Sequence, residues 1–313
     1  MNSYKIIDTG VNKNPDISIA MITYNHANYI GKAIESVLMQ VTEYSYELVI
    51  ADDFSTDGTR ETISIYQEKY PQKIKLLLEN KNVGAYENHQ VLLSNLSGRY
   101  IAVLDGDDYW IDSGKLQEQV TFLENNPDFS MCFTNIKLID GNGKTIKNEL
   151  LKYSKDIFSH ESFITKISPP TLTIVYRKEA LPEVLPDDFK KVGNGDMFMK
   201  AMMSEHGKIK YLNKITGIKC LHPGGISSGK SYLKREETKL FTYSVMLKYF
   251  KSRTVKENLK KAMGKSYLRL LYHYALRREF KNFSRICKSF FDFSITNRLF
   301  PPVWLIFNKL KRN

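Results

Sequence analysis

The sequence has few cysteines and no long apolar runs. Its three cysteines, Cys132, Cys220 and Cys287, lie far apart and are odd in number. They offer neither a disulfide framework nor a metal-ligand spacing, so we expect a reducing compartment. No apolar segment approaches the ~18 residues that predict a transmembrane helix. The polar stretch 1–15 also lacks the apolar core of a signal peptide, and these absences together favour a cytoplasmic protein.

Acidic residues are scarce in the last quarter of the chain. Residues 230–313 contain 21 Lys and Arg but only 5 Asp and Glu, a net charge of +16. Residues 1–229 contain 25 basic and 29 acidic residues, a net charge of −4. This asymmetry predicts a folded body over 1–229 and a basic helical C-terminal region over 230–313 with an anionic partner.

Two acidic clusters follow apolar segments that have the composition of buried strands. Asp52 and Asp53 end the run 48–51, and Asp105-Gly106-Asp107-Asp108 ends the run 100–104. Open α/β sheets bind their ligands at the carboxyl ends of the strands. Crowded carboxylates repel one another, so such clusters usually hold a cation or hydrogen-bond donors. The sequence therefore predicts a site for a metal ion and a nucleotide.

Strand and helix patterns alternate in the first half of the chain. The expected strands are 17–23, 47–51, 73–78 and 100–104, and the expected helices are 27–39, 59–70, 85–96 and 115–125. Later expectations are strands over 130–139 and 171–176, a helix over 196–206, a strand pair or extended connection over 208–218, and helices beyond 231. The alternation predicts βαβ units and an α/β fold with a parallel sheet.

The segments Ile17–Asn25, Leu48–Thr59 and Leu104–Trp110 resemble the signature segments of family 2 glycosyltransferases. The resemblance is dense over 16–125, thinner to about 230, and does not cover the basic tail. It implies the GT-A fold, a Rossmann-like, mostly parallel sheet with a nucleotide-sugar half (16–125) and an acceptor half (126–229). It also implies transfer of a sugar, with inversion, from a nucleotide diphosphate-sugar, most often a UDP-sugar, to a glycan hydroxyl.

The resemblance assigns the second acidic cluster to a metal ion and the nucleotide. Asp105-Gly106-Asp107 matches the family's Asp-x-Asp motif for Mn²⁺ or Mg²⁺. We favour Asp107 as a ligand, with Asp105 and Asp108 assisting in an order left open. Such a cation stabilises the charge of a departing diphosphate. Gly106, which has no side chain, is expected to let the loop approach the diphosphate closely.

The first cluster and the preceding loop correspond to the family's base pocket. Asp53 matches the carboxylate that accepts a hydrogen bond from the base, typically the uracil N–H. Thr23, Tyr24 and Asn25 sit on the loop after the first expected strand and would line this pocket. Phe54 stands where many family members have Gly.

Two further residues correspond to catalytic positions of the family. Asp196 matches the carboxylate that deprotonates the acceptor, although it could also cap the following helix. His222, in the segment 220–228, matches a residue that reaches the metal or the diphosphate, with a structural role as the alternative. Trp110 is expected to pack under the acidic loop. His26 and His89 show no metal-ligand pattern and are expected to be structural or exposed.

The basic tail leaves two interpretations open. Its helices could pack on the body or on a second copy, forming a homodimer, or dock on an anionic membrane. The terminal apolar patch 304–307 favours the membrane. We expect a peripheral enzyme at the inner face of the cell membrane, acting in cell-surface polysaccharide or lipid-linked glycan synthesis.

Two other functions compete with sugar transfer, and a third alternative is an inactive family member that only binds nucleotide. A metal-dependent nucleotidyltransferase would usually carry a Gly-rich, basic phosphate loop after the first strand, whereas residues 24–28 are Tyr-Asn-His-Ala-Asn. A nucleic-acid-binding protein could use the basic tail. That function leaves the acidic clusters unexplained, so no nucleic acid is expected as a partner.

Overall fold

The computed structural model describes residues 4–182, 185–225 and 231–297. The chain forms two compact units that are each discontinuous in sequence. Within the described residues, the first unit contains 4–163, 167–182 and 199–225, and the second contains 164–166, 185–198 and 231–297. The second unit therefore includes the segment before Met199 as well as the basic tail.

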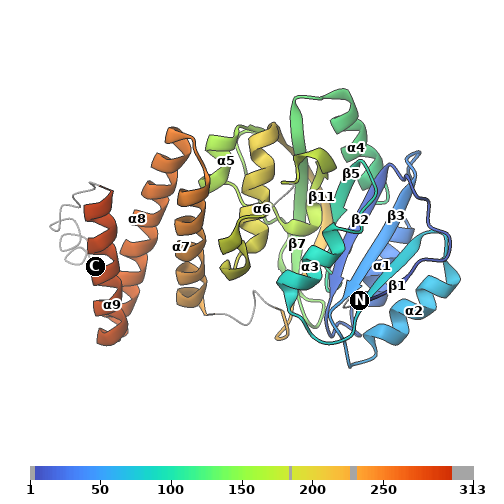
Figure 1. Cartoon of the computed structure of the whole chain (residues 1–313), viewed down its shortest axis with the longest axis horizontal. Coiled ribbons are helices and arrows are strands. Elements are labelled where there is room, and N and C mark those ends of the chain that lie inside the picture. The colour runs from blue at the N-terminus through green and yellow to red at the C-terminus, as the bar shows by residue number, and fades with distance from the viewer. Residues whose placement is uncertain (1–3, 183–184, 226–230, 298–313) are drawn as a thin grey trace. The chain divides into compact units, whose positions relative to one another are not determined.

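A mixed β-sheet forms the centre of the first unit (Figure 1). In chain order its strands are β1 Tyr4–Ile7, β2 Ile17–Thr23, β3 Tyr46–Asp52, β4 Ile74–Glu79, β5 Tyr100–Val103, β6 Tyr109–Trp110, β7 Phe129–Asp140, β8 Thr145–Lys147, β9 Ile157–Phe158, β10 Val175–Arg177 and β11 Lys208–Leu221. The strand order is β1-β4-β3-β2-β5-β10-β7-β11-β6, with β8 beside β7 and β9 beside β11.

The pairing of these strands confirms the predicted α/β class. β2 pairs in parallel with β3 and β5, β3 with β4, and β7 with β11. β10 pairs antiparallel with both β5 and β7, and so joins the two parallel parts of the sheet. The acidic clusters end β3 and β5, which both pair with β2, so the sheet brings them to the same edge.

Helices with one apolar face flank this sheet (Figure 1). Their bounds are α1 Ile30–Leu38, α2 Thr59–Lys69, α3 Ala85–Leu93, α4 Lys115–Asn125, α5 His160–Lys166 and α6 Gly195–Met203, with 3₁₀ turns at Thr171–Thr173, Lys178–Ala180, Asp187–Lys191 and Ser204–His206. In α1 the residues at helical spacing, Ile30, Ile34 and Val37, are fully buried in the core shared with the sheet.

The basic tail is helical, as the sequence predicts. It contains α7 Tyr232–Tyr249, α8 Arg253–Leu276 and α9 Phe280–Thr296. The side chains of Ser231 and Ser252 accept backbone N–H bonds and cap the starts of α7 and α8. Tyr267 of α8 stacks on Phe290 of α9 with ring centroids 5.1 Å apart, so aromatic packing holds these two helices together.

Within the described residues, no helix combines the length and the apolar character that crossing a bilayer requires. The apolar patch 304–307, on which part of the membrane prediction rests, lies outside the described residues.

Three segments differ from their sequence-based expectations. Strand β1 lies in the polar stretch 1–15, for which the sequence predicts no strand, and it adds a short antiparallel edge to β4. The expected strand 171–176 divides into a 3₁₀ turn and β10. The region 208–218 is one long strand, β11, whose register with β7 shifts between Tyr211 and Gly217. This irregularity interrupts the alternation of apolar and polar side chains along the strand. The sequence pattern therefore suggests a strand pair or an extended connection.

Candidate functional site

The acidic loop, residues 105–108, lies against the end of β2. The backbone N–H of Gly106 donates to the carbonyl of Ile22 at 3.0 Å. A Cβ at Gly106 would lie 2.9 Å from Thr23 Oγ1 and 3.0 Å from His26 Nδ1. Gly is therefore required here because the loop packs closely on the protein's own backbone and side chains.

Asp108 fastens the acidic loop to β11. Its side chain is almost fully buried, and Oδ1 accepts the backbone N–H of Cys220 at 3.0 Å. The Lys219 ammonium lies 3.5 Å from Oδ2. Burial raises the pKa of the Asp108 carboxyl to about 8, against the opposing influence of Lys219. Lys219 thus provides one positive charge beside the carboxyl groups of Asp105, Asp107 and Asp108.

Asp107 and His222 meet across the sheet edge. His222 follows the end of β11, and its Nε2 lies 3.0 Å from Asp107 Oδ2. The Tyr29 ring stacks on the His222 ring with centroids 4.5 Å apart. Two predicted ligands from distant parts of the sequence are therefore in direct contact.

Two groups of side chains at this edge have the geometry of a cation site. Asp105, Asp107 and Asp108 each offer an oxygen, and these atoms lie within 4.8 Å of one another. His26, Asp107 and His222 form a second group that meets the same limit. Carboxylate oxygens suit Mg²⁺ and Mn²⁺, so the residues present fit the cation that the sequence predicts.

His26 was expected to be structural or exposed. It lies in this second group, and it is the main site residue that sequence reasoning missed. Its backbone N–H donates to Thr59 Oγ1 at 2.9 Å, and Nδ1 contacts Thr23 Oγ1 at 3.2 Å. Burial lowers the pKa of the ring, so the imidazole is neutral near pH 7. Only its place directly after Asn25, in the predicted nucleotide loop, could have drawn attention to it.

The two carboxylates that end β3 have different environments. Asp52 pairs with Arg60 at 2.5 Å, and Arg60 also donates to the backbone carbonyl of Glu79. Asp53 accepts the backbone N–H groups of Val83 at 2.7 Å and Gly84 at 3.0 Å. Asp53 thus orders the segment before α3 at the place where the sequence predicts a contact with the base.

The environment of Asp53 has an electrostatic consequence. Burial raises the pKa of its carboxyl, and the N–H donors of Val83 and Gly84 oppose that rise. Each of its two oxygens accepts one of these bonds, and a carboxylate oxygen can accept two. A further donor from a ligand can therefore be accommodated.

The predicted base-pocket residues lie on two loops that are bonded to each other. The Asn25 backbone N–H donates to Ser55 Oγ, and Asn25 Oδ1 accepts the Thr56 backbone N–H, both at 2.9 Å. Thr23 is buried, whereas Tyr24 is 45% exposed. The loops after β2 and β3 therefore form one wall, with Tyr24 presented to solvent.

Phe54 lies on this wall in an unusual backbone conformation. Its φ of 62° is in the left-handed region that Gly adopts without steric cost. The Arg60 guanidinium lies 5.0 Å from the centroid of its ring. This cation–π contact offsets part of the strain, which explains how Phe is tolerated where Gly fits the backbone better.

Asp196, the predicted base, is exposed in the first turn of α6. It belongs to the second unit, whereas the acidic loop belongs to the first. Trp110, by contrast, confirms its prediction: it is 1% exposed, and its indole N–H donates to the Leu172 carbonyl at 2.7 Å.

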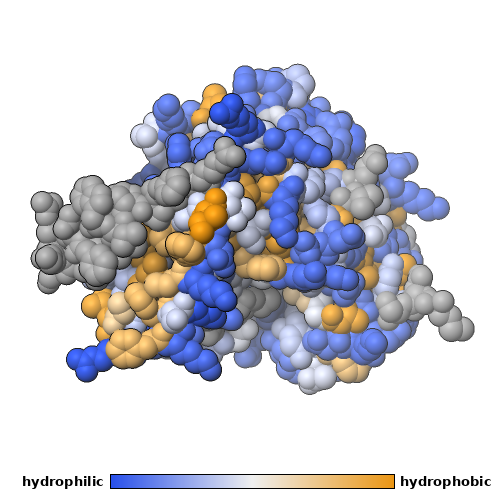
Figure 2. All heavy atoms as spheres, turned by 60° about the vertical axis from the view of Figure 1, so that its left-hand side comes forward, coloured by the Kyte–Doolittle hydropathy of each residue, from blue (hydrophilic) through white to orange (hydrophobic). Residues whose placement is uncertain are grey.

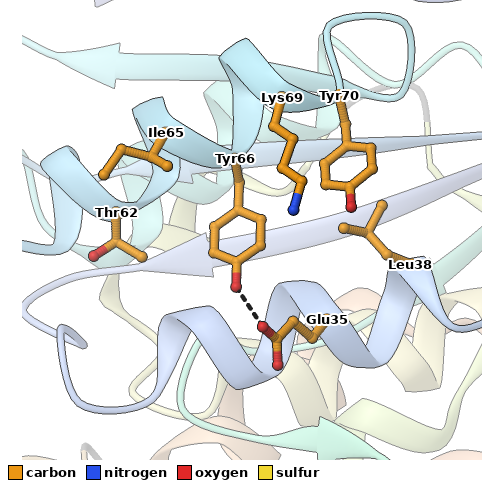
Figure 3. A pocket seen from close by; sticks show the side chains of 7 residues that line it. All are labelled: Glu35, Leu38, Thr62, Ile65, Tyr66, Lys69 and Tyr70. Atoms are coloured by element: carbon orange, nitrogen blue, oxygen red, sulfur yellow. Dashed lines mark hydrogen bonds between the residues drawn. The ribbon is translucent and has the colours of Figure 1, made fainter.

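A separate cavity of about 360 Å³ lies between α1 and α2 (Figure 3). Its lining residues are Glu35, Leu38, Thr62, Ile65, Tyr66, Lys69 and Tyr70. The Tyr66 hydroxyl donates to Glu35 at 2.7 Å across this cavity. None of the predicted site residues contributes to this cavity.

Comparisons with known sequences find a matching family model and several relatives. A family model described as glycosyl transferase family 2 matches residues 18–185. An uncharacterized protein of Mycobacterium tuberculosis is 31% identical over 211 residues, 67% of this chain and 60% of that protein. A UDP-Glc:alpha-D-GlcNAc-diphosphoundecaprenol beta-1,3-glucosyltransferase of Escherichia coli is 35% identical over 142 residues, 44% of this chain and 54% of that protein. The chain thus spans 54% to 60% of the length of these curated relatives.

Solved structures share the fold at low sequence identity. Staphylococcus aureus TarS, solved with UDP-GlcNAc, aligns with a TM-score of 0.60 at 17% identity, covering 88% of this chain and 91% of that one. The mannosyltransferase PcManGT of Pyrobaculum calidifontis, solved with GDP-Man and Mn²⁺, gives 0.57 at 14% identity, covering 84% and 76%. These similarities confirm the expected GT-A sheet flanked by helices.

Proposed function

Because the chain belongs to glycosyl transferase family 2, we propose that it moves a sugar from a nucleotide diphosphate-sugar to a hydroxyl group of a glycan. The observation that carries this proposal is the contact of Asp107 with His222 at the sheet edge, beside Asp105 and Asp108. This edge is where α/β sheets bind nucleotides. TarS with UDP-GlcNAc and PcManGT with GDP-Man support a nucleotide-sugar donor.

A UDP-sugar is the donor that we favour. The predicted base-pocket residues Tyr24, Asn25 and Asp53 lie on two adjacent loops, which are joined by hydrogen bonds. Asp53 has capacity for one more donor on each oxygen, which suits the N–H of a uracil ring. The E. coli relative's name also specifies UDP-Glc.

Asp105, Asp107 and His222 are the residues that we assign to a divalent cation, Mn²⁺ or Mg²⁺. When bound, the cation supplies positive charge that stabilises the leaving diphosphate. The chain's own contribution is to hold its ligands in place: Gly106 is bonded to β2, and Asp108 is bonded to β11. Lys219 adds a fixed positive charge at the same edge.

Asp196 is the base that we assign to the acceptor. As the acceptor oxygen bonds to the anomeric carbon, its proton passes to the Asp196 carboxylate. The bond from that carbon to the diphosphate breaks, and the nucleotide diphosphate leaves with the electron pair. Attack opposite the leaving group inverts the anomeric carbon. An exposed carboxylate in the first turn of a helix is accessible for this role.

The second unit supports a location at an anionic membrane, near a lipid-linked acceptor. On α9 the side chains of Phe280, Phe291 and Ile295 are 72%, 65% and 60% exposed. Lys281 and Lys288 are exposed on the same helix. Figure 2, which brings the left-hand side of Figure 1 forward, shows apolar side chains between hydrophilic ones on the surface turned to the viewer. Exposed aromatics beside lysines match the chemistry of an anionic lipid interface.

The experiment that tests this function is a screen of nucleotide-sugars with Mn²⁺ and a hydroxyl acceptor. Release of free nucleotide diphosphate signals sugar transfer, whereas release of pyrophosphate signals nucleotidyl transfer. Thermal stabilisation by UDP in the presence of Mn²⁺ gives an independent readout of binding. Pyrophosphate release, or the absence of any nucleotide-sugar binding, would contradict the proposal.

A further inference from the structure

We propose that His26 is a further ligand of the cation site, and that two imidazoles make this site prefer first-row transition ions to Mg²⁺. The inference rests on the proposed function, because it concerns the cation assigned to Asp107 and His222. It adds a ligand from the loop between β2 and α1, a part of the chain outside the Asp-x-Asp motif.

The distances among the three side chains suit a single ion. His26, Asp107 and His222 each offer one ligand atom, and these atoms lie within 4.8 Å of one another. Two ligands of one ion, each ~2.1 Å from it, lie at most ~4.2 Å apart. Side-chain shifts of a few tenths of an ångström would therefore bring all three into coordination.

The rings of His26 and His222 are arranged so that they do not block each other. Their centroids lie 6.1 Å apart with the planes at 90°. Asp107 Oδ2 lies 3.0 Å from His222 Nε2, so two of the three ligand atoms already face each other.

The His26 ring is held in place by neighbours that are not ligands. Thr23 Oγ1 lies 3.2 Å from Nδ1, and the backbone N–H of His26 donates to Thr59 Oγ1. The carbonyl of His26 accepts the backbone N–H of Ile30 at 2.9 Å, which fixes the residue at the start of α1. Such a supported ring is typical of a metal-binding histidine, whose orientation is set by hydrogen bonds around it.

The donor set predicts the ion. Imidazole nitrogen binds Co²⁺, Ni²⁺ and Zn²⁺ well, whereas Mg²⁺ requires oxygen ligands. Among first-row ions, the affinity of such a site rises from Mn²⁺ to Co²⁺ and beyond. Lys219, beside Asp108, lowers the net negative charge that all three divalent ions meet, so the difference among them comes from the ligand type. The site should therefore bind Mn²⁺ more tightly than Mg²⁺, and Co²⁺ more tightly than Mn²⁺.

Direct metal titration of the full chain tests this inference without any turnover. Calorimetric affinities for Mg²⁺, Mn²⁺ and Co²⁺ would be measured for the unchanged protein and for His26→Asn, which keeps a polar group near Thr23. We expect His26→Asn to lower the Co²⁺ affinity about 10- to 100-fold and the Mg²⁺ affinity much less. His206→Asn, at an exposed histidine of the first unit, is the matched control and should change neither.

Spectroscopy supplies a second readout. Nitrogen couplings measured by pulsed EPR on the Mn²⁺-loaded protein should correspond to two imidazoles, and to one in His26→Asn. A purely structural role for His26 would lower the metal-free unfolding temperature and weaken all three ions alike. That result, or unchanged Co²⁺ affinity in His26→Asn, would overturn the inference while leaving the proposed function intact. If Asp107→Asn also fails to weaken any ion, the cation site of the proposed function fails with it.

Discussion

The ammonium group of Lys115 lies 4.3 Å from the centroid of the Trp110 indole ring. Lys115 is fully buried, and its Nζ has no hydrogen-bond partner among the described residues. Trp110 lies in strand β6, two residues after Asp108, so this pair is close in sequence to the acidic loop. Burial lowers the pKa of Lys115 to about 7, because the charged form loses its hydration.

The first prediction concerns stability as a function of pH. The pKa of Lys115 is about 7 in the folded chain and about 10.5 in the unfolded chain. The unfolded chain therefore takes up the proton first as pH falls, and the folded state loses stability. This loss of folding stability begins near pH 10.5 and is complete below about pH 7. We expect Lys115→Met to stabilise the protein by more than ~1 kcal/mol at pH 6, and by less at pH 10. Urea unfolding at both pH values, with the exposed Lys190→Met as control, measures this. A stability gain independent of pH would contradict it.

The second prediction concerns Asp107. Replacing it with Asn removes a charged ligand from both clusters while keeping the size of the side chain. Turnover should fall by at least ~10²-fold, because charge on the leaving diphosphate is no longer stabilised. EDTA should have a comparable effect on the unchanged enzyme, reversed by added Mn²⁺. Nucleotide release assays measure both, and full activity after exhaustive chelation would contradict the metal assignment.

The third prediction concerns Asp196. Asp196→Asn removes the proposed proton acceptor, so turnover should fall ~10²- to 10⁴-fold while UDP binding is unchanged. The control is Asp187→Asn, at an exposed aspartate in the same unit, which should keep full activity. Steady-state kinetics and calorimetric UDP titration separate the two effects. If Asp196→Asn retains normal turnover, another residue is the base.

The fourth prediction uses the left-handed backbone at Phe54. Both Phe54→Gly and Phe54→Ala remove the ring and its contact with Arg60. They differ mainly in the steric cost of adopting the φ of 62° at this position. The Gly variant should be more stable than the Ala variant by about 1 kcal/mol, because only Gly adopts this conformation freely. Chemical unfolding of the pair measures the difference, and equal stabilities would show that the strain is absent.

The sequence predicts local features of this fold better than contacts between distant segments. The buried runs 17–23 and 100–104, and the helix 115–125, appear almost as expected because apolar periodicity determines them. The bond from Cys220 to Asp108 and the approach of His26 to Asp107 could not be predicted. They depend on how β2, β5 and β11 are ordered in the sheet, and no local pattern specifies that order.

Edge and irregular strands were also beyond local reasoning. The short strand β1 is stabilised by its antiparallel pairing with β4 rather than by its own composition. In β11, the shift in register between Tyr211 and Gly217 interrupts the alternation of side chains. Such irregularities follow from the partner strand, so periodicity in a single segment does not reveal them.

The last prediction concerns the exposed apolar side chains of α9. If they insert into an anionic lipid interface, Phe280→Ser with Phe291→Ser should weaken binding to vesicles containing phosphatidylglycerol. Lys281→Glu with Lys288→Glu should also weaken vesicle binding. This effect should be larger at low salt than at high salt, because salt screens exposed charges. Ile65→Ser, at a 64% exposed residue of the first unit, is the matched control and should bind as the unchanged protein does. Vesicle sedimentation across a salt series measures all four proteins. If the α9 variants instead change the mass of the particle in solution while vesicle binding persists, this face joins two copies of the chain and the membrane assignment is wrong.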